Sequence, residues 1–262
     1  MSRKRQIKHS GFIEFIKTIF YALILAGLIR TLFFQPFWIP SGSMKPTLLV
    51  GDFIFVNKFS YGYSRHSCPF SLCPITDRLF FSSPERGDVV VFRHPVNGKD
   101  FVKRLIGLPG DKITVKDGKL IINQKLLNYQ EAEDFVEIKN KQGPLDSIPR
   151  CHNSPVPLGS YCFKRQFREE LPNGVGYSVL DIGSFFGDNT PEFKVPPNNY
   201  FFLGDNRDNS LDSRFGLSSG GVGFVEAKYL IGRVDRIVFS SAGKSMLFFW
   251  SWRSDRFFRS VY

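Results

Sequence analysis

Histidine is scarce in this chain, with four residues among 262. His9 belongs to a basic N-terminal stretch, and His66 and His152 fall in irregular segments. Only His94, in "FRHP" at the end of an apolar run, could serve a Ser-His-Asp site. An ordinary histidine in a loop at the end of a strand is the better interpretation of this residue. The GxSxG motif of α/β-hydrolases is absent as well. A nucleophilic serine in this chain would need another base.

Cysteine is equally scarce, and its four positions form two close pairs. Cys68 and Cys73 bracket "PFSL", while Cys151 and Cys162 bracket a loop rich in Pro, Ser and Gly. Such local pairs suit disulfides in an oxidising compartment, but four cysteines allow three pairings and the sequence leaves the choice open. Neither spacing matches the short ligand pairs of a zinc site. We expect no metal ion and no cofactor.

Acidic residues are missing from the first ten positions, "MSRKRQIKHS", in a chain whose formal net charge is +11. No RNA-binding or helix-turn-helix pattern accompanies this charge, which argues against nucleic acid as the partner. An apolar run follows directly, and basic residues ahead of such a run mark the cytoplasmic side of a membrane. The N-terminus is therefore predicted to stay in the cytoplasm.

The apolar run, "FIEFIKTIFYALILAGLIRTLFF", is expected to form one membrane-spanning helix. Its uncharged centre is short, but Glu14 and Lys17 can pair on one helix face, and Lys17 and Arg30 can snorkel, so the span reaches about 20 residues. No small-x-small cleavage site follows it. We predict that residues 1–34 form a basic tail and an uncleaved anchor, and that residues 35–262 form a domain outside the cytoplasm.

Long helical periodicity is missing after the anchor. Short β-type runs such as "DVVVFRHP", "DFVKRLIG" and "YLIGRVDRIVFS" are separated by Gly, Asp, Asn and Pro, and "KDGK" is typical of a hairpin turn. The fold class is therefore predicted as mainly β, with an antiparallel core. Two irregular stretches, residues 60–86 and about 128–197, are interpreted as insertions, and the longer one is expected to form a small β subdomain.

Three stretches carry residues suited to chemistry. In "IPSGSMKPTLLVGD", Gly42 would let the chain turn sharply, so that Ser41 and Ser43 face one reacting group. In "DFVKRLIGLPGD", Lys103 shares a strand face with apolar residues, although a lysine that snorkels past them is the simpler interpretation of this stretch alone. "GDNRDNSLDSRFG" is either a solvated loop, a calcium site that its two arginines disfavour, or a buried polar network.

Taken together and in this order, these stretches resemble the bacterial type I signal peptidases. The resemblance covers the anchor, "PSGSMKPTL", "RGDVVVF", "KRLIGLPGD", "GDNRDNSLDSR" and "GVGFV". It implies a membrane-bound serine endopeptidase with a β catalytic core, which removes signal peptides from exported preproteins after small residues in an Ala-x-Ala pattern. It also implies a single-pass protein of the bacterial inner (plasma) membrane, with a periplasmic or extracytoplasmic catalytic domain and the bilayer as a further partner.

The family's catalytic residues map onto this sequence one by one. The nucleophile corresponds to Ser43 and the general base to Lys103. The oxyanion hole corresponds to the hydroxyl of Ser41 and the backbone N–H of Ser43. Lys103 acts as a base only when neutral, so its pKa must fall from about 10.4 toward roughly 8, and burial among apolar neighbours could lower it that far.

The resemblance also implies supporting and substrate-binding residues. The hydroxyl that orients the lysine corresponds to Ser210, and the supporting carboxylate and guanidinium correspond to Asp212 and Arg214. The shallow substrate pocket corresponds to three residues: Ile39, Pro40 and Val102.

Two alternatives share part of this pattern. Self-cleaving repressors use a similar Ser-Lys pair on a similar β fold, but they carry a DNA-binding domain and lack an anchor. A membrane-tethered binding module would keep the fold without turnover, although every matched catalytic position is filled. The aromatic stretches "TLFFQPFW" and "LFFWSWRSDRFF" suit a bilayer interface, and for the second a final core strand is an equally good interpretation.

Overall fold

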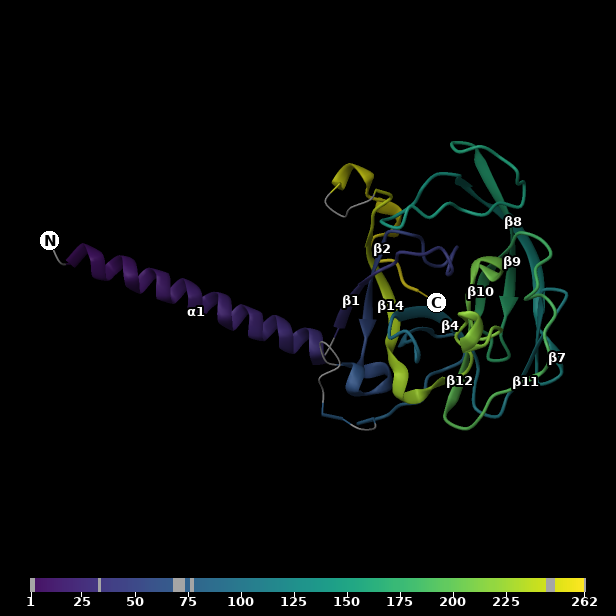
Figure 1. Ribbon diagram of the computed structural model, residues 1–262, viewed down its shortest axis with the longest axis horizontal. Helices are drawn as coiled ribbons and strands as arrows, with labels where there is room; N and C mark the ends of the chain where they lie inside the picture. The colour runs from purple at the N-terminus through teal and green to yellow at the C-terminus, as the bar shows by residue number, and fades with distance from the viewer. Residues whose placement is uncertain (1–2, 33, 68–73, 76–77, 244–247, 262) are drawn as a thin grey trace.

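The computed structural model describes residues 3–32, 34–67, 74–75, 78–243 and 248–261. A single long helix, α1 (Arg3–Leu32), extends away from a β-rich body (Figure 1). Residues 11–28 of α1 are long and apolar enough to cross a membrane, and none of them is buried in the protein. Lys17 and Glu14 form the expected pair, with 3.0 Å between Nζ and Oε1. The predicted N-terminal apolar helix is thus present.

The body is built on an antiparallel sheet of seven described strands. Neighbouring strands follow the order β1 (Phe34–Trp38), β2 (Asp52–Asn57), β14 (Leu230–Ser240), β3 (Val89–Arg93), β4 (Asp100–Gly107), β12 (Asn199–Leu203) and β13 (Val225–Glu226). Inward residues of this sheet, such as Ile54 and Val56 on β2, are fully buried. The mainly β, antiparallel fold class is confirmed.

Two smaller antiparallel sheets complete the body. One contains β10 (Gly176–Asp181), β9 (Tyr161–Glu170) and β8 (Asn128–Ile138), and the other contains β11 (Phe193–Lys194), β5 (Lys112–Lys116), β6 (Lys119–Ile122) and β7 (Lys125–Leu126). The predicted "KDGK" hairpin joins β5 to β6, and both of its central residues, Asp117 and Gly118, have positive φ, as a two-residue hairpin turn requires.

Short 3-10 helices occupy several connections. They span Phe59–Tyr61, Arg65–Ser67, Arg207–Asn209, Leu217–Ser219, Ala227–Tyr229, Phe249–Ser251 and Ser254–Arg256.

The longer predicted insertion supplies the whole sheet β10-β9-β8. Its residues Tyr177 and Val179 pack in one buried cluster with Ile106 of β4 and Phe201 of β12. The inserted sheet therefore shares a core with the main sheet, and the division of residues 35–262 into a domain and a subdomain stays a prediction. A disulfide joins Cys151 to Cys162 within this segment. The other suggested pair, Cys68 with Cys73, lies outside the described residues.

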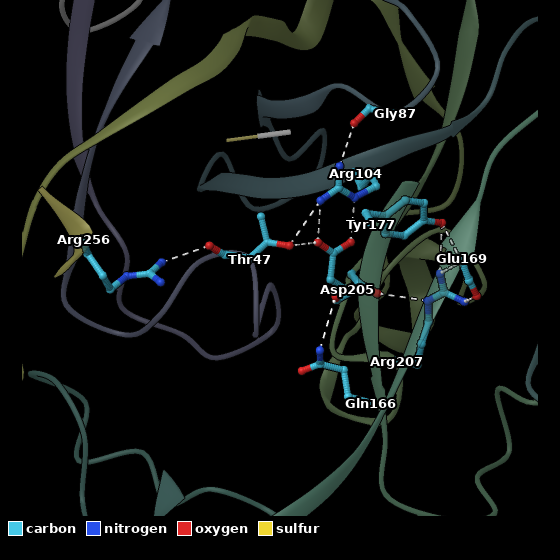
Figure 2. A network of polar contacts seen from close by, with 11 residues as sticks. Thr47, Gly87, Arg104, Gln166, Glu169, Tyr177, Asp205, Arg207 and Arg256 are labelled. Carbon is cyan, nitrogen blue, oxygen red and sulfur yellow. Dashed lines mark hydrogen bonds and ion pairs between the residues drawn. The ribbon is translucent and has the colours of Figure 1, made fainter. Parts of the chain in front are cut away.

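Buried charges also join the inserted sheet to the main sheet, as Figure 2 shows. Arg207 donates to both carboxylate oxygens of Glu169 on β9, at 2.7 and 2.5 Å, and the hydroxyl of Tyr177 donates to the same carboxylate at 2.6 Å. Arg104 of β4 donates twice to Asp205, at 2.8 and 2.7 Å, and its guanidinium lies over the ring of Tyr177. Paired, bidentate contacts of this kind fix geometry as well as charge.

We expect Glu169→Ala to lower the free energy of unfolding by about 3–5 kcal/mol, because it leaves the buried guanidinium of Arg207 without its partner. Denaturant unfolding of the full chain in detergent measures the change. Glu192→Ala is the matched control, since Glu192 pairs with Lys112 at 3.3 Å on the exposed surface and its loss should cost about 1 kcal/mol or less. Equal losses in the two variants would contradict the structural role of the buried pair.

Candidate active site

A cleft of about 590 Å³ opens between the end of β1, the start of β4 and the segment around residue 210. Its walls are formed by residues 37–41, 43–44, 100–103 and 208–211, together with Arg150, Phe185 and Phe186 from the inserted segment. The three stretches that the sequence singled out therefore meet in one place, although they are far apart along the chain.

The turn that carries Ser41 and Ser43 is held by hydrogen bonds from the loop that follows β12. Asn206 donates its backbone N–H to the carbonyl of Ser43 at 3.0 Å, and its side-chain amide donates to the carbonyl of Gly42 at 2.8 Å. Ser41 is exposed in the cleft and Ser43 is half-buried. Both hydroxyl residues are thus presented to the cleft by a backbone that Asn206 fixes.

Gly42 fits this turn for a reason other than the predicted one. Its φ does not lie in the left-handed region, so the turn does not depend on glycine's conformational freedom. A Cβ atom at this position would instead lie 3.2 Å from Cε and 3.4 Å from Cδ of Lys45. Close packing against a lysine stem, which a single sequence does not reveal, is what favours glycine here.

Lys103 of β4 lies directly against Ser43. Nζ of Lys103 is 2.6 Å from Oγ of Ser43, and the lysine side chain is almost fully buried. Burial lowers the pKa of Lys103 to about 8, against the opposing effect of the carboxylates of Asp212 and Asp205. A lysine with this pKa is neutral in a minor but appreciable fraction of molecules near physiological pH, far more than an ordinary lysine, and in that form its amine can accept a proton from the serine hydroxyl.

Behind Lys103 the expected pair of Asp212 and Arg214 is present and buried. Nε and Nη2 of Arg214 lie 2.9 and 3.0 Å from the two carboxylate oxygens, and the N–H of Gly204 donates to the same carboxylate at 3.1 Å. Burial raises the pKa of Asp212, but Arg214 and these hydrogen bonds outweigh it and keep that pKa below its usual value. The carboxylate therefore stays ionised while its charge is compensated locally.

Ser210 lines the same cleft, but its contacts differ from those expected. Its Oγ is buried and has no hydrogen-bond partner among the described residues, so the hydrogen bond that would orient Lys103 is not formed here. The hydroxyl packs against the backbone of Gly204, where a Cβ atom would lie 2.2 Å from it. The role of Ser210 in orienting Lys103 stays a prediction.

The other predicted residues also reach the cleft, while His94 has a different environment. Ile39, Pro40 and Val102 form part of the wall beside Ser43 and Lys103. His94 is buried elsewhere, with Nε2 3.1 Å from the carbonyl of Gly221 and Nδ1 accepting from two backbone N–H groups. Both ring nitrogens thus have structural partners, which supports the loop-histidine interpretation over a catalytic one.

Sequence reasoning missed several residues of the site. Arg150, Phe185 and Phe186 line the cleft although they lie in the segment interpreted as an insertion, and no periodicity or motif marks them. Asn206 belongs to the polar stretch that the sequence did single out, so its composition was a usable signal even though its contacts were not predictable.

Comparisons with known proteins agree on one family. Residues 12–239 match the family described as signal peptidase, peptidase S26. Signal peptidase I of Rickettsia canadensis is 38% identical over 235 residues, which cover 86% of this chain and 79% of that protein. Signal peptidase I of Rickettsia typhi is 39% identical over 231 residues, which cover 84% of this chain and 78% of that protein.

A crystal structure of a signal peptidase I from Enterococcus faecalis also matches, with 23% identity and a TM-score of 0.30, covering 58% of this chain and 97% of that chain. This likeness is too weak to support a conclusion.

We expect the amine of Lys103 to titrate near pH 8 rather than near 10.4, because burial disfavours the ammonium form. NMR of isotope-labelled lysine in the full chain would follow the Cε signals against pH, with Lys103→Ala identifying the relevant signal. Lys45 should titrate in the same range as Lys103, since burial also lowers its pKa to about 8. The exposed lysines are the reference signals and should titrate in the ordinary range. A Lys103 signal that titrates with the exposed lysines would contradict the description of the site.

Proposed function

Since this chain belongs to the signal peptidase family, peptidase S26, and removes signal peptides from exported preproteins, we propose that Ser43 is its nucleophile and Lys103 its general base. The observation that carries this proposal is the 2.6 Å approach of a buried lysine amine, with a lowered pKa, to a serine hydroxyl in a cleft. Serine proteases that lack a catalytic histidine use lysine in this way.

The reaction follows from these positions. Neutral Lys103 takes the proton of the Ser43 hydroxyl as Oγ attacks the scissile carbonyl, and the carbonyl oxygen becomes an oxyanion. The backbone N–H of Ser43 and the hydroxyl of Ser41 donate to that oxyanion, and losing one such donor typically costs about 2.7–4 kcal/mol. The ammonium of Lys103 then protonates the leaving amine, which breaks the peptide bond and leaves the signal peptide esterified to Ser43.

Hydrolysis of the acyl enzyme uses the same groups. Lys103, neutral again, takes a proton from a water molecule as that water attacks the ester carbonyl. The ammonium returns the proton to Oγ of Ser43, which releases the signal peptide as a free acid. Asp212 and Arg214 remain a compensated pair throughout, so the charge that moves is carried by Lys103 and the oxyanion.

The substrate preference for small residues is supported by the wall of the cleft. Ile39, Pro40 and Val102 place apolar surface next to the two reacting side chains, and a shallow apolar surface of this kind suits the small side chains of an Ala-x-Ala site. The strand β1, which leads into this wall, follows α1 almost directly. A peptide that emerges from the membrane beside α1 would therefore meet the cleft early.

We propose that the protein lies in the bacterial inner (plasma) membrane, with its N-terminus in the cytoplasm and residues 35–262 on the other side. An N-terminal apolar helix fits a membrane anchor. The basic residues Arg3, Lys4 and Arg5, which precede the apolar part of that helix in the sequence, favour this orientation. The disulfide between Cys151 and Cys162 also favours an oxidising compartment for the β-rich body.

Contact of the body with the bilayer interface is part of the same proposal. Aromatic rings follow one another near the paired ends of β2 and β14, with centroids of Phe53 and Phe239 5.0 Å apart and those of Phe239 and Trp252 5.5 Å apart. Phe249 and Trp250 are 69% and 71% exposed. The described part of this C-terminal segment forms short 3-10 helices, so the interpretation as a final core strand does not hold for it.

Cleavage of a preprotein with an Ala-x-Ala site by the full chain, in detergent or lipid, tests the dyad. Ser43→Ala and Lys103→Ala should each lower kcat by at least about 10³-fold, because each removes half of a unit that acts together. For the intact protein, kcat/KM should rise with pH through about 8, since the neutral form of Lys103 predominates above its pKa.

His94→Gln is the control for the dyad and should retain cleavage, because both ring nitrogens of His94 bond to backbone groups and neither contacts Ser43 or Lys103. Cleavage that survives Lys103→Ala would point to another base. An intact protein that binds the preprotein without cutting it would favour the binding module instead.

Fluorescence quenching tests the contact with the bilayer. The chain has three tryptophans, so a Trp38→Phe variant leaves only Trp250 and Trp252 as emitters. In vesicles whose acyl chains carry bromine, their emission should be quenched relative to matched unbrominated vesicles, because interfacial indoles lie at the headgroup level. Equal emission from the two kinds of vesicle would contradict an interfacial position of this segment.

A further inference from the structure

A buried charge cluster lies beneath the turn that carries Ser43. Lys45, two residues after Ser43, is only 3% exposed. Its Nζ is 2.5 Å from Oε2 of Glu137 on β8 and 2.8 Å from Oε1 of Gln142. The other oxygen of Glu137 lies 2.5 Å from Nζ of Lys164 on β9. The inserted sheet thus reaches the nucleophile turn through one lysine side chain.

The stem of Lys45 touches the turn itself. A Cβ atom at Gly42 would lie 3.2 Å from Cε of Lys45, and the N–H of Lys45 points to the carbonyl of Gly42 at 3.3 Å. Asn206, in the loop after β12, donates to that same carbonyl. The backbone between Ser41 and Ser43 is therefore held from two sides, by Asn206 and by Lys45.

Glu137 keeps the stem of Lys45 in contact with the turn. Two ammonium groups, those of Lys45 and Lys164, share its single carboxylate, and Gln142 donates to it at 2.7 Å. Breaking a buried ion pair leaves an uncompensated charge, whereas an exposed lysine is free to adopt many rotamers. Without Glu137, the free energy would favour a rotamer of Lys45 that places the ammonium in solvent. The stem of Lys45 would then no longer pack against Gly42.

We propose that Lys45 and Glu137 are positioning residues for the nucleophile, through which the inserted sheet sets the placement of Ser43 and Ser41 relative to Lys103. This inference rests on the proposed Ser43–Lys103 dyad. It gives the sheet β10-β9-β8 a part in catalysis, although none of these strands supplies a reacting group.

Position matters at this turn because the two serines act on one carbonyl. A displacement of about 1 Å at a reacting group can cost about 10²-fold in rate. Ile39, Pro40 and Val102, which line the proposed substrate pocket, come from the end of β1 and from β4. Loosening of the turn should therefore lower the rate of the chemical step and leave substrate affinity nearly unchanged.

Single-turnover cleavage by the full chain tests this inference. The enzyme is kept in saturating excess over the preprotein, so the rate constant reports folded molecules even where a variant is partly unfolded. Lys45→Met removes the ammonium that ties the stem to Glu137, and Glu137→Gln removes the carboxylate to which that ammonium is tied. Each should lower the rate constant by about tenfold to a hundredfold, with the half-saturating enzyme concentration within about twofold of the intact protein.

The two changes should also be coupled. Because both changes remove the same ion pair, the double variant Lys45→Met/Glu137→Gln should cleave no more slowly than the slower single variant. The pH-rate profile of Lys45→Met should keep its midpoint, because that midpoint belongs to Lys103. Lys112→Met and Glu192→Gln, which alter an exposed ion pair between β5 and the residue that precedes β11, should leave the rate constant unchanged.

Should Lys45→Met fail to fold, Glu137→Gln/Lys164→Met provides the same test, since it removes one charge of each sign and still releases Lys45. The inference is overturned if these variants cleave at the rate of the intact protein, if the single losses multiply in the double variant, or if the loss lies in affinity alone. Ser43→Ala, assayed in parallel, separates the two hypotheses. Cleavage by Ser43→Ala would refute the dyad, whereas its inactivity beside a fully active Lys45→Met would refute only the positioning role.

Discussion

A buried lysine amine held beside a serine hydroxyl is the constraint on which this structure depends. An ammonium group buried among apolar and paired groups is costly, and a free amine in water is protonated at neutral pH. The site meets both limits by burying Lys103, while the two carboxylates that raise its pKa each have a cationic partner. Asp212 pairs with Arg214 and Asp205 with Arg104, so neither is left free to hold Lys103 fully in its charged form.

That compensation explains why so many charges are buried around one cleft. Arg104 follows Lys103 directly on β4, and strand alternation sends the two side chains to opposite faces. One face receives the base, and the other receives a guanidinium that ties β4 to Asp205 and stacks on Tyr177 of the inserted sheet (Figure 2). The same short stretch therefore carries both the reactive group and the contact that fixes it.

The C-terminal segment contributes to the same support from another side. Arg256 donates to both oxygens of Asp52, at 3.0 and 2.6 Å, and to the carbonyl of Thr47 at 2.9 Å, and the hydroxyl of Thr47 lies 2.5 Å from Asp205. The nucleophile turn is thus enclosed by the main sheet, the inserted sheet and the C-terminal segment. Rigid surroundings on several sides are what a site needs when one reacting group comes from a turn and the other from a strand.

The sequence by itself determined the apolar helix, the antiparallel β class and the short stretches around Ser43, Lys103 and Asp212, because hydrophobic patterning, turn residues and motif order are local properties. Only the tertiary structure decided that these stretches share one cleft and that Arg150, Phe185 and Phe186 complete its wall. It also decided that Lys45 reaches Glu137 and that Gly42 is favoured by packing rather than by φ. Such contacts join residues from distant parts of the chain, and their geometry depends on how the sheets pack, which no local pattern encodes.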